Sequence, residues 1–176
     1  MPATTRVQRR SPNRNMKPNY LLLFFCLVAC VCFAQTTPAP KPPLSAPKDA
    51  KLFNRKWYAV FQEKVSWSTA REKCERMGGQ LVVVHDKLTW DYVAGLTQVR
   101  VWLGASDEKL EGEWVWVDGK KMTFTAWADV NPTNSGGKEH YLSFTPKSGQ
   151  WNDVPKDWDY YKEAPIVGYI CEWEAR

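Results

Sequence analysis

The chain has 176 residues, with 24 Lys and Arg against 19 Asp and Glu, and this length excludes a tandem multidomain enzyme. Five of the basic residues and none of the acidic ones precede residue 35, so the rest of the chain is neutral. A neutral domain gives no electrostatic reason to expect nucleic acid or an anionic membrane surface as a partner. All ten tryptophans lie after residue 56, which predicts a large aromatic core there.

The N-terminal part has the pattern of an export signal. An apolar run over residues 21–34 follows a basic stretch; it is too short to span a bilayer as a helix and is typical of a signal peptide. We therefore expect residues 1–34 to be a signal peptide and the protein to be secreted or otherwise extracytoplasmic. Residues 27–30 also match a bacterial lipoprotein signal, in which Cys30 would carry a lipid anchor. Translation begins at either Met1 or Met16, because Met16 precedes an ordinary short basic start.

The next segment separates this leader from the folded part. Residues 35–50 carry five prolines and no apolar periodicity, which predicts an extended, semi-rigid linker. We expect a single domain over residues 51–176. Only Cys74 and Cys171 of the five cysteines lie in it.

The first half of this domain predicts two helices between short strands. Residues 56–62 alternate and are rich in aromatic side chains, which predicts a strand. Ser66 can cap a helix that ends near Gly78. A short buried strand is expected over residues 81–84, after which Asp86 can cap a second helix.

The second half predicts short strands. A buried strand is expected over residues 101–104, and Asp118 followed by glycine is typical of a hairpin turn, here between strands at 113–117 and 122–125. Further short strands are expected at 141–144, 150–151 and 168–172. Helices followed by many strands, without regular alternation, imply an α+β fold with antiparallel sheets.

A series of motifs over residues 56–173 resembles the C-type lectin-like domain. In chain order they are Trp67-x-x-Ala70, Cys74 with Gly79-Gln80-Leu81 after it, Trp102-Leu103-Gly104-Ala105-Ser106-Asp107, Trp114-Val115-Trp116, Asn131-Pro132, Trp151-Asn152-Asp153 and Tyr169-Ile170-Cys171-Glu172. The resemblance implies the C-type lectin-like fold, with two helices, short antiparallel sheets and a long irregular loop region. Residues 139–142 and 168–173 are similar to bacterial members, which favours a bacterial, exported protein.

The cysteines can be compared with this family. In an exported protein, pairing is favoured over two free thiols. The resemblance implies that Cys74, in the first helix, pairs with Cys171, in the last strand. The family's second disulfide would fall at Tyr141 and Lys156, so it is missing here. We therefore expect bound calcium or aromatic packing to order the long loop region.

The resemblance also implies a sugar-binding calcium site. Its ligands would be oxygen atoms of Asn131, Thr133, Glu139, Asn152 and Asp153, with a cis bond before Pro132. Calcium prefers several oxygen ligands, of which carboxylates supply most of the attraction. The family usually has Glu-Pro-Asn or Gln-Pro-Asp where this chain has Asn-Pro-Thr. Only Glu139 and Asp153 are carboxylates in this set, so we expect weak calcium binding.

A second, weaker calcium site is implied in the same loops by Asp107 and Glu111 together with Asn134 and Glu139. The alternative is a solvated acidic hairpin, and His140 stands where the family has a carboxylate. We expect neither His85 nor His140 to bind zinc, because no cluster of Cys and His would complete a site.

Trp158 differs from the other tryptophans, most of which we expect in the core. It lies in a polar and aromatic stretch, residues 156–161, where an exposed ring could stack on a sugar. Alternatively, these aromatic residues pack back onto the loop that lacks the second disulfide.

These observations favour an exported, weakly calcium-dependent carbohydrate-binding domain, whose partner would be a glycan or a cell-surface polysaccharide. The alternative is a lectin-like domain that binds protein without calcium. An enzyme is not expected. Glu139 and Asp153 resemble the carboxylate pair of a glycosidase only in residue type, and no nucleophile elbow, Ser/His/Asp set or phosphate loop is present in the sequence.

Overall fold

A computed structural model describes residues 40–175 except 147, 161 and 164, and the following statements concern these residues. The expected signal peptide, Cys30 and the start of the linker lie outside them. No helix in the described part is long and apolar enough to cross a membrane.

One mixed sheet organises the domain. Within the described residues it has eight strands, in the order β1-β2-β8-β4-β6-β7, with β3 beside β8 and β5 beside β4. The strands are β1 (Lys51–Phe53), β2 (Lys56–Phe61), β3 (Gln80–Leu81), β4 (Val101–Ser106), β5 (Val115–Trp116), β6 (Tyr141–Thr145), β7 (Gln150–Val154) and β8 (Gly168–Glu174). Two helices and this sheet confirm the α+β prediction.

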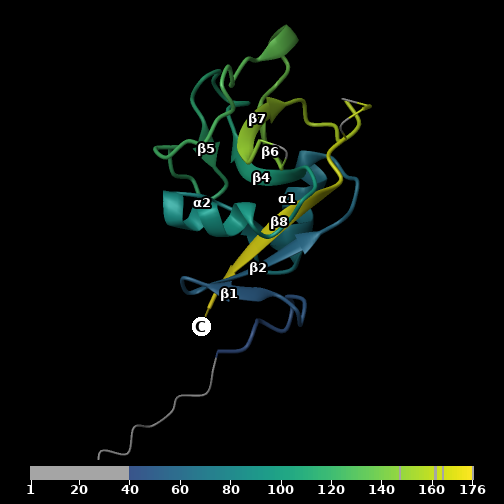
Figure 1. Cartoon of the computed structure of the whole chain (residues 1–176). Helices are drawn as coiled ribbons and strands as arrows, with labels where there is room; N and C mark the ends of the chain where they lie inside the picture. The colour runs from purple at the N-terminus through teal and green to yellow at the C-terminus, as the bar shows by residue number, and fades with distance from the viewer. Residues whose placement is uncertain (1–39, 147, 161, 164, 176) are drawn as a thin grey trace, which may run out of the picture. The chain divides into compact units, whose positions relative to one another are not determined.

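The last strand occupies the middle of the sheet. Figure 1 shows β8 running beside β2, with which it is antiparallel over six residue pairs. On its other side β8 pairs with β4 in parallel, so the sheet, which is otherwise antiparallel between its named strands, is mixed. Parallel neighbours need a long connection, and more than 60 residues separate β4 from β8.

The hairpin predicted around Asp118 is shorter than expected. Only Val115 and Trp116 form a strand, and Val115 makes an isolated bridge to Lys121. Residues 122–125 are not a strand; Phe124 instead contributes its ring to the core. The backbone N–H of Met122 still donates to the Trp114 carbonyl over 3.0 Å, beside this packing.

Both helices begin at the predicted caps. The Ser66 hydroxyl accepts a hydrogen bond from the backbone of Thr69 at the start of α1 (Trp67–Arg76). Asp86 does the same for Thr89 at the start of α2 (Lys87–Ala94). Such caps satisfy backbone N–H groups that have no partner inside the helix.

The disulfide expected from the family resemblance is present. Cys74 on α1 and Cys171 on β8 are bonded, with their Cα atoms 5.6 Å apart and a sequence separation of 97. Both are fully buried. The bond therefore joins the first helix directly to the central strand of the sheet.

Aromatic packing holds the long loop region on the sheet. Trp151 on β7 is fully buried, and the rings of Trp116, Phe124 and Trp127 lie with their centroids 5.7 to 5.8 Å from its own. Edge-to-face contacts of this kind stabilise a core beyond the area that they bury. Phe124 and Trp127 come from the loop itself, so its aromatic side chains fix it to β7.

Part of the expected linker packs against the domain. Ala46 and Ala50 are buried in the same cluster as Trp57 and Cys74. The Ser45 hydroxyl also donates to the backbone carbonyl of Met77, at the end of α1. Residues 45–50 are therefore held by the folded part and are not an extended spacer.

Candidate functional site

The loop that contains Pro132 folds onto the end of β7. The Asn131–Pro132 peptide bond is cis, as expected. The backbone N–H groups of Thr133 and Asn134 both donate to Oδ2 of Asp153, over 2.8 and 2.6 Å. The strand thus supplies a carboxylate, and the loop wraps around it.

The same loop also encloses Glu139. Its Oε2 atom accepts hydrogen bonds from the Thr133 hydroxyl at 3.0 Å and from the Ser135 backbone at 2.6 Å. In return, the Glu139 backbone N–H donates to the side-chain oxygen of Asn134 at 3.1 Å. A short 3₁₀ helix, η1 (Ser135–Gly137), bridges these contacts. Sequence reasoning had not included Ser135, because a backbone donor leaves no signal in residue type.

Two carboxylates are therefore buried side by side. Glu139 is 1% exposed and Asp153 is not exposed at all. Burial raises the pKa of the Asp153 carboxyl, and the charge of Glu139 raises it further, although the N–H groups of Asn134 and Thr133 act in the opposite direction. Buried like charges are unfavourable unless something compensates them.

One oxygen atom of these two carboxylates has no group that would offset the cost of its burial among the described residues. Oδ1 of Asp153 is buried and has no hydrogen-bond partner among the described residues. A buried carboxylate oxygen in this state is costly for the protein. A bound cation would satisfy it, so the site fits calcium on the chemistry of its donors.

The remaining predicted ligands flank this centre. Asn131 begins the cis-proline turn and Asn152 precedes Asp153 on β7; both are partly exposed. The structure thus brings together Thr133, Asn134, Glu139 and Asp153 by hydrogen bonds, and places the two asparagines next to them in the chain.

Trp158 is half-buried and packs against the core cluster that contains Trp67 and Ile166. The Lys64 ammonium lies 5.4 Å from the centroid of its ring, which is a cation–π contact. The ring therefore packs partly on this core cluster, and a role in sugar stacking stays a prediction.

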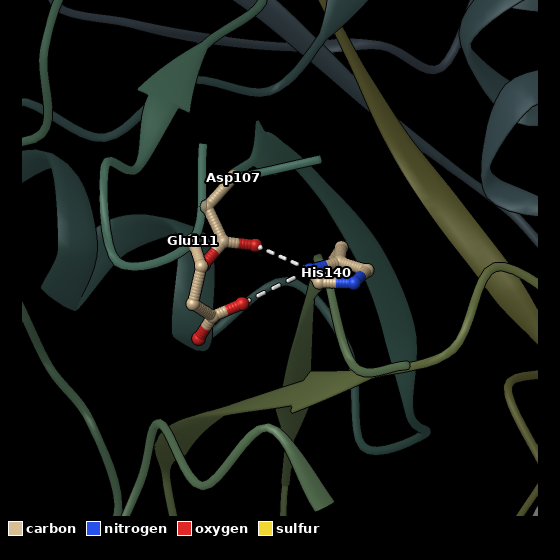
Figure 2. Close-up of side chains that lie close together, drawn as sticks. All are labelled: Asp107, Glu111 and His140. Atoms are coloured by element: carbon tan, nitrogen blue, oxygen red, sulfur yellow. Dashed lines mark hydrogen bonds and ion pairs between the residues drawn. The ribbon is translucent and has the colours of Figure 1, made fainter. Parts of the chain in front are cut away.

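A second group of side chains lies at the ends of β4 and β6. Figure 2 shows His140 facing two carboxylates, with its Nδ1 atom 3.1 Å from Oδ1 of Asp107 and 3.3 Å from Oε2 of Glu111. The expected partner Asn134 is engaged with Glu139 instead. His140 thus belongs to a group of three side chains whose atoms could bind a metal ion. The pairing of Ser106 with Tyr141 brings residues 107 and 140 together.

The domain has a mixed sheet, two helices, a disulfide to the last strand and two groups of carboxylates in its loops. Together these features are those of a lectin-type binding domain. The sequence model of the "Lectin C-type domain" family matches residues 63–163. The chain belongs to this family.

Several known proteins are similar to the chain. Chicken (Gallus gallus) hepatic lectin is 34% identical over 125 residues, which are 69% of this chain and 56% of that protein. Perlucin from Haliotis laevigata is 30% identical over 125 residues, covering 67% of this chain and 75% of perlucin. The chain thus spans little more than half the length of the hepatic lectin.

A solved structure confirms the fold. The cow C-type carbohydrate-recognition domain of CD23, determined in the presence of a GlcNAc2Man3 oligosaccharide, superposes with a TM-score of 0.66 at 26% identity. The match covers 74% of this chain and 97% of that one. The relatives described here are all animal proteins, so the expected bacterial source has no support among them.

Proposed function

We propose that this protein is an exported carbohydrate-binding domain that depends weakly on calcium. The observation that carries the proposal is the cis-proline loop folded over two buried carboxylates, one of which has an oxygen atom with no partner among the residues that the structure describes. Family membership supports it, since the names of the relatives include a lectin and a carbohydrate-recognition domain.

In this proposal the residues of the loop and of β7 hold the ion. Glu139 and Asp153 supply the charge, while Asn131, Thr133 and Asn152 supply neutral oxygen atoms. Calcium would contribute open coordination positions that accept sugar hydroxyls. With only two carboxylates in the set, we expect a dissociation constant of about 10⁻⁴ to 10⁻³ M or poorer, as in extracellular modules.

The loop also bears on the choice of sugar. With its carbonyl oxygen on calcium, Asn131 has only its amide NH₂ to offer, so it is a hydrogen-bond donor at this position. Thr133 can both accept and donate. By resemblance to the family, a donor at the first position favours galactose-like over mannose-like diols. We propose a non-mannose glycan or polysaccharide, with Trp158 stacking on the sugar through the part of its ring that remains exposed.

Single-sugar affinity should be low, and useful binding would come from many copies displayed on one surface. We also propose that the chain reaches that surface by export. The apolar run over residues 21–34 supports this, either as a cleaved signal or, through Cys30, as a lipid anchor. Members of this family are generally binding proteins, and we propose no reaction.

A glycan array tests the proposal, with each protein applied once in calcium and once in chelator. We expect calcium-dependent retention of the wild type on non-mannose glycans, loss in Asp153→Asn, and reduced retention with unchanged calcium affinity in Trp158→Ala. Asp91→Asn, on the exposed side of α2, is the matched control and should behave as the wild type.

Retention on mannose-rich glycans would show that the donor argument is wrong. Equal signals in calcium and in chelator would instead reject calcium dependence. An array without any bound glycan, combined with an unchanged melting temperature in calcium, would favour the alternative, a protein-binding domain that needs no calcium.

A further inference from the structure

The second group of side chains consists of two carboxylates and one imidazole from different parts of the chain. Asp107 follows β4, Glu111 lies in the next turn, and His140 precedes β6. One donor atom from each lies within 4.8 Å of the other two. Figure 2 shows both carboxylates directed at the same edge of the imidazole ring.

The spacing of these atoms fits a small metal ion. Zinc binds nitrogen and oxygen ligands at about 2.0 to 2.2 Å in a tetrahedron, whose corners are then about 3.3 to 3.6 Å apart. Nδ1 of His140 lies 3.1 Å from the Asp107 oxygen and 3.3 Å from the Glu111 oxygen. The Asp107 and Glu111 oxygens lie within 4.8 Å of each other, so closing this third edge would place the three atoms around a common centre.

We infer that Asp107, Glu111 and His140 bind a divalent transition-metal ion of the zinc type. The two carboxylates carry the charge that neutralises such an ion. The imidazole nitrogen decides its class, because imidazole suits zinc, nickel and copper, whereas calcium takes six to eight oxygen ligands. The inference is separate from the carbohydrate site, since neither Asp153 nor Thr133 belongs to this group.

The surrounding backbone already orients two of the three ligands. Asp107 is 2% exposed, and its second oxygen accepts a hydrogen bond from the Gly112 backbone at 2.8 Å. The Asp107 backbone N–H donates to the carbonyl of His140 at 3.2 Å, which ties the two segments together. Support of this kind around the ligands raises the metal affinity of a site.

Glu111, the third ligand, lies at the surface and leaves the site open to solvent. The Glu111 side chain is 53% exposed and that of His140 is 28% exposed. An ion can therefore enter from solvent, and a water molecule can fill the fourth position of the tetrahedron.

Zinc titration of the purified, metal-stripped chain by calorimetry tests the inference. Cys26, Cys30 and Cys32 are replaced by serine in every variant, because free thiols also bind zinc. We expect one zinc ion per chain, bound more tightly than calcium at this cluster. His140→Ala should weaken zinc binding by about tenfold or more, and His85→Gln, at the other histidine of the sequence, should leave it unchanged.

A donor exchange separates this site from the carbohydrate site. In an Asp153→Asn background, which disables the proposed sugar site, zinc binding should persist. His140→Asp in that background should reverse the preference from zinc to calcium. The inference is overturned if the wild type binds no zinc, if His140→Ala binds it as tightly as the wild type, or if calcium displaces zinc from the cluster at equal concentration. In those cases the three residues form an ion-pair cluster only.

Discussion

The backbone N–H of Thr133 lies 2.8 Å from Oδ2 of Asp153, twenty residues further along the chain. The loop thus satisfies one oxygen of this carboxylate, while Oδ1 has no hydrogen-bond partner in the described part of the chain. The raised pKa of Asp153 has a consequence for stability. Between the unfolded and the folded pKa the folded state binds more protons, so stability falls as pH rises through this window, and the cost is complete above the folded pKa.

Asp153→Asn removes this cost while retaining an oxygen that can accept the loop hydrogen bonds. Without calcium we expect the variant to be more stable than the wild type at neutral pH, as measured by urea unfolding. In calcium at ten times its dissociation constant, the wild type should gain about 1.4 kcal/mol and the variant nothing. A wild type that is already the more stable of the two without calcium would contradict the burial argument.

The disulfide gives a prediction on the stability of the whole domain. Replacing Cys74 and Cys171 together with alanine removes a constraint on a loop of 97 residues. In the chain-entropy model this lowers the free energy of unfolding by about 4.7 kcal/mol. Urea unfolding of oxidised wild type, reduced wild type and the double variant measures the loss. Alkylation of either cysteine in the native, oxidised protein would show that the bond is not formed.

A third prediction concerns Asp118, in the turn after β5, and the stability of the fold at low pH. Burial alone would raise the pKa of Asp118, but hydrogen bonds from His85 at 2.8 Å and from Lys120 lower it to about 2. A lowered folded pKa stabilises the fold above the unfolded value of 3.8, and this contribution is lost as pH falls toward 2.

We expect this loss to amount to about 2 kcal/mol in the wild type. Asp118→Asn should be less stable at neutral pH and should show a shallower decline below pH 4. Asp91→Asn, at an exposed ion pair on α2, serves as the control for a change of one charge. A decline in Asp118→Asn as steep as that of the wild type would contradict the prediction.

Local signals predicted the helices well, because their causes are local. Ser66 and Asp86 cap their helices by contacts three residues away, which a sequence displays directly. The pairing of β4 with β8 depends on residues more than 60 positions apart, and nothing in either segment indicates its direction. Family resemblance supplied what local signals could not, namely the disulfide and the cis bond before Pro132.

The candidate site was predicted in part. Glu139 and Asp153 were predicted as ligands of the ion, which stays a prediction; their burial and their backbone partners follow from packing and could not be predicted. The same limit applies to His140. It was set aside as a metal ligand because sequence reasoning searched for cysteine and histidine partners, whereas the fold supplies carboxylates from 29 and 33 residues away.

The central position of β8 has a consequence for the order of events during synthesis. The strand that separates β2 from β4, and that carries Cys171, comes after all the other described strands in the chain. A nascent chain that has not reached residue 174 lacks the element on which both halves of the sheet pair. The pairs β1–β2, β4–β6 and β6–β7 can form without β8, but the two halves of the sheet join only through it, so the sheet closes late in folding.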